Sequence, residues 1–231
     1  MSNDEFSQHI SRQFNDELEE VRSHLLAMGG MVEKQVADAV SSLVNADSAL
    51  ALEVLTTEKK INSMELAIDE ECTRVIALRQ PAASDLRLLV VATKANIDLE
   101  RMGDEASKVA KMAIKLSEDG VLPKGYIEVR HIGAHVCTML HDALDAFARF
   151  DADLALQVVH EDRSVDMEYE SAMRQLVTFM MEDPRYITRV LNVLWSLRAL
   201  ERIGDHARNI AEHVIYLVKG RDVRHKPLDE L

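Results

Sequence analysis

The sequence contains one unit twice, and this duplication constrains the fold more than any other feature. The stretch DSALALEV at residues 47–54 matches DADLALQV at residues 151–158, and the spacing is about 104 residues. The stretch ERMGDEA at 100–106 matches ERIGDHA at 201–207 at a spacing of about 101. Pro81 and Pro184 mark the same corner of each copy. Self-similarity of this kind predicts two copies of one supersecondary unit packed against each other.

Each unit has the hydrophobic pattern of long helices. Apolar residues recur every three or four positions along residues 18–43, which is the period of an amphipathic helix. A second helix is expected over residues 48–80, with Asp47 as its N-cap and with Pro81 ending it. Hydrophobic residues make up 47% of the chain, and only eight glycines and four prolines are present. That composition favours long helices over sheets.

A third helix completes each unit. Ser84 or Asp85 is expected to cap it in the first copy. We therefore predict an all-α protein made by tandem duplication of a three-helix bundle, with six long helices. The stretch SEDGVLPKG, with its glycines and proline, predicts the connection between the units. The predicted organisation is residues 1–117 for the first repeat, 118–125 for the linker, 126–218 for the second repeat and 219–231 for a C-terminal tail.

Charge and composition exclude several classes of function. The net charge of −13 repels phosphate backbones, so we expect no nucleic-acid binding. The sequence shows no apolar signal region and no apolar run of about 18 residues. The two cysteines, Cys72 and Cys137, lie far apart, which is typical of reduced thiols. We expect a cytoplasmic protein that does not insert into the membrane, although it can dock on a membrane complex. Phosphate-binding loops and nucleophile motifs are absent from the sequence, so we expect no enzyme.

Two pairs of carboxylates stand out on the third helix of each unit. Glu100 and Asp104 lie one helical turn apart, and Glu201 and Asp205 repeat the arrangement. Like charges at this spacing destabilise a helix. At 100° per residue all four side chains are predicted to project from the outer face of their bundles. Two interpretations stay open at this point: a solvated face paired with nearby arginines and lysines, or ligands for a hard cation, which prefers oxygen donors.

A glycine stands inside each acidic pair. Gly103 and Gly204 each cost a helix interior about 1 kcal/mol relative to alanine. Both lie at the edge of the apolar stripe, so we interpret them as packing residues that let a neighbouring helix approach.

Two histidines offer a weaker metal hypothesis. His131 and His135 have the i,i+4 spacing of one helical zinc arrangement. The stretch between them, HIGAH, lacks the glutamate of the H-E-x-x-H motif. We therefore interpret them as surface histidines.

Longer stretches resemble a known family. The duplicated E-R-x-G-D, the opening QFNDELEEVRSHLLAMGGMVE, the corner RQPAASDLRLL and the segment MLHDALDAFARFD closely resemble the PhoU family of bacterial regulators. The resemblance covers residues 8–225. It implies a two-repeat, six-helix protein, commonly dimeric, that binds metal ions on the bundle surface through the acidic motifs.

The resemblance also implies a function. Members act as negative regulators of the phosphate-starvation response and restrain phosphate uptake. They connect the ATPase subunit of the phosphate ABC transporter to the PAS region of a sensor histidine kinase. The implied metal ligands are Glu100, Asp104, Glu201 and Asp205, for a divalent or trivalent ion (Mg, Mn, Fe or Zn).

Two points remain open beside the resemblance. Asn62 and Asp166 occupy matched positions on the second helix and are second-tier ligand candidates. The alternative function is a ferritin-like metal store or di-iron oxidase. That class expects Glu-x-x-His pairs projecting into a four-helix core, whereas these acids are predicted to point outward.

Overall fold

The computed structural model describes residues 3–119 and 127–224, and these residues form long helices without any strand. None of the helices in these two ranges has a stretch long and apolar enough to cross a membrane. In chain order the elements are α1 (Asn3–Val44), α2 (Ser48–Arg79), α3 (Ala83–Asp119), α4 (Ile127–Arg149), α5 (Ala152–Glu182), a short 3-10 turn η1 (Pro184–Tyr186) and α6 (Ile187–Lys219).

Matching caps begin the second helix of each repeat. The carboxylate of Asp47 accepts a hydrogen bond from the backbone N–H of Leu50 at 3.0 Å. Asp151 caps α5 in the same way, accepting from the backbone N–H of Leu154 at 3.0 Å. A capping carboxylate satisfies one of the unpaired N–H groups in the first helical turn. The N-cap predicted at Asp47 is confirmed, and its counterpart follows from the duplication.

The corner before α3 differs slightly from the prediction. Gln80 adopts a left-handed conformation, with φ at 49°, and ends α2 just before the proline. Helix α3 then begins at Ala83, so Ser84 and Asp85 lie inside its first turn instead of capping it. The predicted cap is wrong because the chain turns back into helix within a few residues of Pro81.

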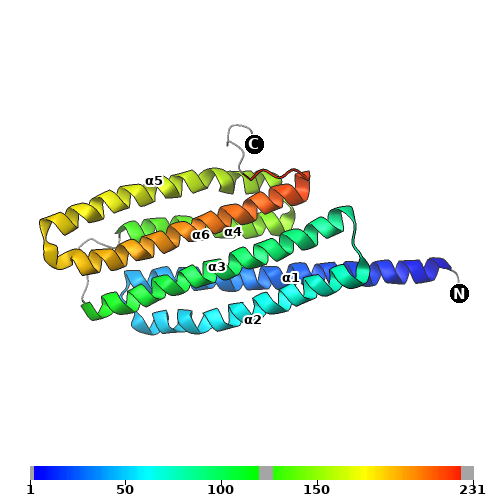
Figure 1. Ribbon diagram of the computed structural model, residues 1–231, viewed down its shortest axis with the longest axis horizontal. Coiled ribbons are helices and arrows are strands. Elements are labelled where there is room, and N and C mark those ends of the chain that lie inside the picture. The colour runs from blue at the N-terminus through cyan, green and yellow to red at the C-terminus, as the bar shows by residue number, and fades with distance from the viewer. Residues whose placement is uncertain (1–2, 120–126, 225–231) are drawn as a thin grey trace.

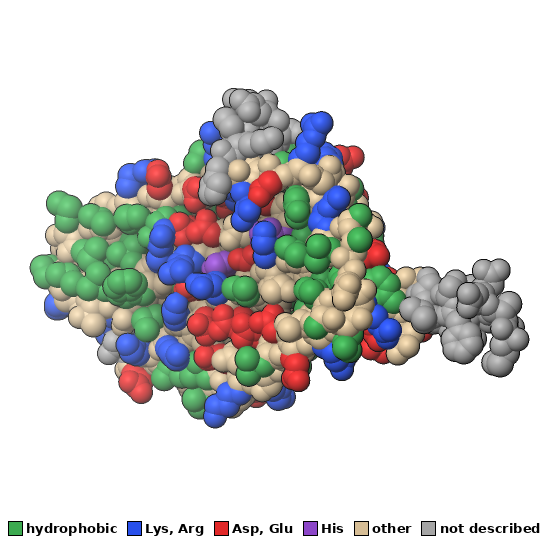
Figure 2. All heavy atoms as spheres, turned by 45° about the vertical axis from the view of Figure 1, so that its right-hand side comes forward, with side chains coloured by type: hydrophobic (Ala, Val, Ile, Leu, Met, Phe, Trp, Pro, Cys, Tyr) green, Lys and Arg blue, Asp and Glu red, His purple; other side chains and the backbone are tan. Residues whose placement is uncertain are grey.

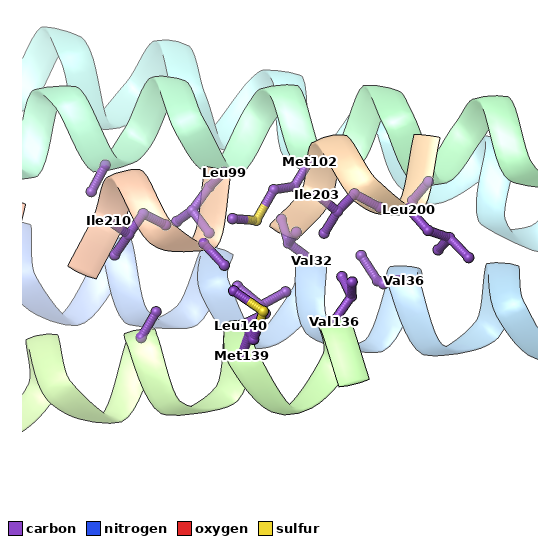
Figure 3. Packing of buried hydrophobic residues seen from close by; sticks show 14 of the residues in the cluster. Val32, Val36, Leu99, Met102, Val136, Met139, Leu140, Leu200, Ile203 and Ile210 are labelled. Atoms are coloured by element: carbon purple, nitrogen blue, oxygen red, sulfur yellow. The ribbon is translucent and has the colours of Figure 1, made fainter. Parts of the chain in front are cut away.

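The two repeats pack side by side along their long axes (Figure 1). Helices α1 and α3 of the first repeat lie against α4 and α6 of the second, while α2 and α5 lie outside them. Side chains from all four inner helices meet in one apolar interior (Figure 3), among them Val32, Met102, Leu140 and Ile203. The buried cluster runs through both repeats. The predicted all-α duplication of a three-helix unit is confirmed, and the two units share one core.

The two glycines of the repeated motif differ in how tightly they are packed. A Cβ at Gly103 would lie 3.1 Å from Oε1 of Gln35 and 3.5 Å from Ile61. A Cβ at Gly204 would lie 3.6 Å from Val165, which is an ordinary van der Waals contact. Close approach therefore explains Gly103, whereas the packing around Gly204 leaves room for a methyl group.

Part of the predicted organisation falls on residues that the structure does not describe. Most of the linker predicted at 118–125 falls in the range 120–126, outside the described residues. Residues 225–231 of the predicted tail are also outside the described residues. Helix α3 runs to Asp119, just beyond the predicted end of the first repeat. The boundaries 1–117, 126–218 and 219–231 stay predictions.

Candidate metal-binding acidic clusters

The four predicted ligands lie beside the outer helix of their own repeat. Glu100 and Asp104 on α3 lie near carboxylates of α2, and Glu201 and Asp205 on α6 lie near carboxylates of α5. Figure 2 shows acidic side chains gathered in two groups on one face, with lysine and arginine side chains between them. The charges that act on the motif carboxylates and their neighbours define two acidic clusters, one in each repeat. The first acidic cluster comprises Glu58, Glu65, Asp69, Glu100 and Asp104, and the second comprises Asp162, Asp166, Glu201 and Asp205.

Burial, together with mutual repulsion, raises pKa values in the first acidic cluster. The pKa of Glu100 is raised by burial and then by the negative charges of Asp104, Glu65 and Glu58, with Arg101 offsetting part of the effect. The pKa of Glu65 is raised by burial and by Asp69 and Asp104. Both shifts show that the carboxylates of α2 and α3 are electrostatic neighbours.

The second acidic cluster is perturbed more strongly. Glu201 is only 8% exposed. Burial raises its pKa to about 7, reinforced by the charges of Asp205, Asp166 and Asp162 and opposed by Arg198. The pKa of Asp205 is raised by burial and by Asp162 and Asp166. A carboxyl group that titrates near neutrality is typical of functional sites.

One oxygen of Glu201 has no partner in the structure. Arg198 donates a hydrogen bond to Oε1. Among the described residues, nothing donates to Oε2, although that atom is fully buried. A buried acceptor left without a donor costs about 1–3 kcal/mol, and more when it is charged. A cation at Oε2 would remove this cost.

The predicted outward orientation needs correction. Glu201 is buried, while Glu100, Asp104 and Asp205 are half-buried. The prediction is wrong for Glu201 because α5 lies against the side of α6 that carries the motif. A helical wheel shows which side is apolar, but it does not show which neighbouring helix covers the remaining sides.

The carboxylates are neighbours, but they do not form a finished coordination shell. In the described parts of the chain, no three His, Cys, Asp or Glu side chains are arranged so that they could hold a metal ion. The donors are all carboxylate oxygens, the set that hard cations prefer. Side chains would have to turn toward a bound ion, and metal binding by Glu100, Asp104, Glu201 and Asp205 stays a prediction.

The two second-tier ligand candidates, Asn62 and Asp166, lie in different surroundings. Asp166 belongs to the second acidic cluster, since its charge raises the pKa of both Glu201 and Asp205. Its sequence match in the first repeat, Asn62, is neutral. Glu65, one turn farther along α2, contributes the charge there. The two clusters are therefore not chemically equivalent.

A buried polar network lies between the repeats, next to the second acidic cluster. Asp98 of α3 is 7% exposed. Its Oδ1 accepts hydrogen bonds from Nδ1 of His206 at 2.8 Å and from the amide of Asn209 at 3.1 Å. Nε2 of His213 lies 3.3 Å from Oδ2. Burial alone would raise the pKa of Asp98, but these three partners outweigh it and lower the pKa to about 2.

Sequence reasoning did not find this network, because Asp98 lies more than a hundred residues before its three partners. One signal was present: His206 follows the second motif where Glu105 follows the first. The structure shows that both positions contact the other repeat. The Glu105 carboxylate lies 3.1 Å from Nε of Arg202, just as His206 contacts Asp98.

A cleft of about 540 Å³ opens between α3 and α6 beside this network. Asp98 and Asp205 both line it, together with Arg208 and Lys94. Arg208 is held by Asp162 at 2.9 Å and by Glu212 at 3.1 Å. The cleft places the second acidic cluster next to the interface between the repeats.

The two histidines of α4 also have carboxylate partners. The ring nitrogens of His135 lie 3.2 Å from Glu168 and 3.1 Å from Glu161. Nδ1 of His131 lies 3.2 Å from the other oxygen of Glu168. All of these contacts with α5 are within ion-pair distance. The side chain of His131 is largely exposed.

Comparison with a protein-family model supports the duplication. The family model of the PhoU domain matches the chain twice, over residues 25–113 and 129–214. Each match spans the acidic motif of one repeat.

Named relatives and solved structures agree with that match. The phosphate-specific transport system accessory protein PhoU homolog of Pseudomonas aeruginosa is 66% identical over 225 residues, covering 97% of this chain and 93% of the relative. The accessory protein PhoU of Escherichia coli is 49% identical, with the same coverage of both chains.

Among solved structures, PhoU from Pseudomonas aeruginosa superposes with a TM-score of 0.89 at 67% identity, covering 90% of this chain and 100% of that one. The phosphate transport system regulatory protein PhoU from Streptococcus pneumoniae gives 0.84 at 30% identity, with coverage of 91% and 99%. The chain belongs to the PhoU family.

Proposed function

We propose that this protein is a phosphate-responsive negative regulator of the phosphate regulon and of phosphate uptake. It acts as a metal-binding adaptor between the ATPase subunit of the phosphate ABC transporter and the PAS region of a sensor histidine kinase. Membership of the family supports the proposal, because its relatives are named as accessory or regulatory proteins of phosphate transport. The adaptor works in the cytoplasm, peripherally at the inner membrane, as a homodimer and without catalysing a reaction.

The second acidic cluster supplies the observation that supports metal binding best. Glu201 is buried, its pKa is raised to about 7, and its Oε2 has no hydrogen-bond donor among the described residues. Folding has thus gathered negative charge where nothing in the described chain neutralises it completely. Glu201 and Asp205, with Asp166 beside them, would hold an ion there, and Glu100 and Asp104 would hold one in the first cluster. A hard divalent or trivalent cation (Mg, Mn, Fe or Zn) suits these oxygen donors.

Metal analysis tests this part of the proposal. The variant with Glu100, Asp104, Glu201 and Asp205 all changed to alanine is purified without chelator next to the wild type, and both are analysed for metals. A matched control changes four exposed acids away from the clusters: Asp16, Glu20, Glu53 and Glu118. We expect the metal to be lost only from the motif variant. Equal metal content in all three proteins would remove the metal claim and leave the adaptor claim standing.

The adaptor part needs a separate experiment. Purified protein is presented to the transporter ATPase subunit and to the PAS region of the kinase, and a deletion strain is assayed for phosphate-regulated gene expression. We expect binding to both partners and derepressed expression at high phosphate. Unchanged expression after deletion would refute the regulatory role.

A ferritin-like metal store or di-iron oxidase is the second candidate function. That class places Glu-x-x-His ligands inside a four-helix core. The first acidic cluster instead lies between α2 and α3, and the second lies between α5 and α6. Both are outside the apolar interior that the inner helices share. Oxidase turnover by the metal-loaded protein would favour this candidate over the adaptor.

A further inference from the structure

Large apolar side chains are exposed on both helices that meet at the second corner. They form two stripes at i,i+4 spacing, one on each helix, in antiparallel order about Pro184. Trp195 is 65% exposed and Met181 is 80% exposed. Figure 2 shows hydrophobic side chains gathered at the end of the molecule where α5 meets α6. We name this surface the apolar face; its residues are Met173, Val177 and Met181 of α5 and Ile187, Leu191 and Trp195 of α6.

The fold itself does not require the whole apolar face, because the first repeat carries only part of it. At the matched positions α2 carries Asp69, Thr73 and Ala77, and on α3 Lys94 stands where α6 has Trp195. The same three-helix architecture therefore forms with polar or small residues at four of the six positions. At the other two positions the first repeat keeps the apolar residues Leu86 and Val90, so only the second repeat exposes apolar side chains at all six. An exposed apolar patch of this kind marks a binding surface.

The charges around the apolar face differ from those of the whole protein. Residues 171–200 contain four arginines and two acids, whereas the chain carries a net charge of −13. Arg185 is paired with Asp183 and Arg198 with Glu201, so Arg174 and Arg189 are the arginines that contribute charge to the rim. Arg189 has no carboxylate partner among the described residues, and Arg174 has only a 3.7 Å contact with Glu170. An apolar surface with an arginine rim complements an occupant whose own rim is acidic.

From these observations we propose that the apolar face binds an amphipathic helix of a partner protein, with acidic residues flanking the apolar stripe of that helix. Two antiparallel stripes at i,i+4 spacing offer contacts to the apolar side chains that an amphipathic helix presents at the same spacing. Methionine adapts to an irregular apolar surface, and tryptophan and arginine are the side chains that most often dominate binding energy. The inference rests on the adaptor function, since it names the surface that one of the adaptor's partners occupies.

A second copy of the chain fits this face less well. A twofold dimer built on the apolar face would set it against itself. That arrangement would bring the rims with Arg174 and Arg189 of both copies together. Like charges facing each other across an interface are unfavourable. The charge pattern thus favours a different protein as the occupant.

Trp195 allows a direct test, because it is the only tryptophan in the chain. Protein labelled with 5-fluorotryptophan gives one fluorine NMR signal, recorded with the transporter ATPase subunit and, separately, with the PAS region of the kinase. Val177→Glu with Leu191→Glu disrupts the face. Leu52→Glu with Leu78→Glu is the matched control on exposed positions of α2. Circular dichroism confirms that each variant is folded.

We expect one partner to shift the Trp195 signal, and its affinity to fall about tenfold or more in the face variant but within about twofold of wild type in the control. Reversing the rim with Arg174→Glu and Arg189→Glu should weaken the same complex, as should added salt. Binding that the face variant and the rim reversal leave unchanged would overturn this inference while the adaptor role stands. If neither partner binds the wild type, the adaptor role fails and the inference fails with it. A signal shift on raising the concentration of the protein alone, abolished in the face variant, would identify a second copy as the occupant and overturn the inference.

Discussion

Replacing Asp98 by asparagine should destabilise the protein at the interface between its repeats. Asp98 is buried between α3 and α6, and His206, Asn209 and His213 all point at its carboxylate. The amide of an asparagine is nearly the same size, so the substitution removes the charge and leaves the packing in place. The measured change in stability therefore reports the electrostatic contribution of the network.

The magnitude follows from the shifted pKa. Burial disfavours the charged form, yet the three hydrogen-bonding partners lower the pKa of Asp98 from 3.8 to about 2. One pKa unit corresponds to about 1.4 kcal/mol of free energy. A carboxyl group whose pKa is lower in the folded state stabilises the protein above the pKa it has when unfolded, and this contribution is lost as the pH falls through the folded value. We expect Asp98→Asn to lower the free energy of unfolding by about 2–3 kcal/mol at neutral pH.

Urea denaturation followed by circular dichroism measures this difference. The loss should stay nearly constant from about pH 7 to pH 5 and fall to about half near pH 3, because the carboxyl of the unfolded chain is then largely protonated while that of the folded protein is still ionised. Asp222→Asn is the control. The pKa of Asp222 is also lowered by its Arg224 partner, but the pair is exposed, so the cost should stay within about 0.5 kcal/mol. Equal losses for the two variants, or a loss below about 0.5 kcal/mol for Asp98→Asn, would refute the reasoning.

Three other substitutions test separate parts of the structure. In chelator-treated protein, Glu201→Gln should raise the free energy of unfolding by about 1–2 kcal/mol near pH 8, after allowance for solvent screening, and change it little near pH 4.5. Because the pKa of Glu201 is about 7 in the folded protein, ionising this carboxyl destabilises the fold only at pH values above the pKa that it has in the unfolded chain. Urea denaturation at the two pH values checks the sign of the stability change. Gly204→Ala should raise the melting temperature, since alanine gains about 1 kcal/mol of helix propensity, whereas Gly133→Ala should lower it because its Cβ would lie 2.7 Å from Val40. Asp47→Ala should cost about 1 kcal/mol in chemical denaturation by removing the N-cap of α2, and no change would mean that the cap contributes nothing.

Much of the fold could be predicted because its determinants are local and repeated. Asp47 caps α2, the chain turns at Pro81, and the apolar period continues through each helix. Each of these signals acts within about one helical turn, so the sequence alone displays it. The duplication then showed that the second half must repeat the first, as the cap at Asp151 does.

What could not be predicted is which helix covers which. The pattern around Glu201 and Asp205 gives their angle on α6, but only the packing of α5 against α6 makes Glu201 a buried acid with a pKa raised to about 7. The same packing between repeats joins His206 to Asp98 and Arg202 to Glu105. The acidic motif thus has two environments at once. Its carboxylates lie beside the outer helix, while the residue after its aspartate contacts the other repeat. A change in charge at the acidic cluster would act on side chains one position away from the contacts that hold the two repeats together.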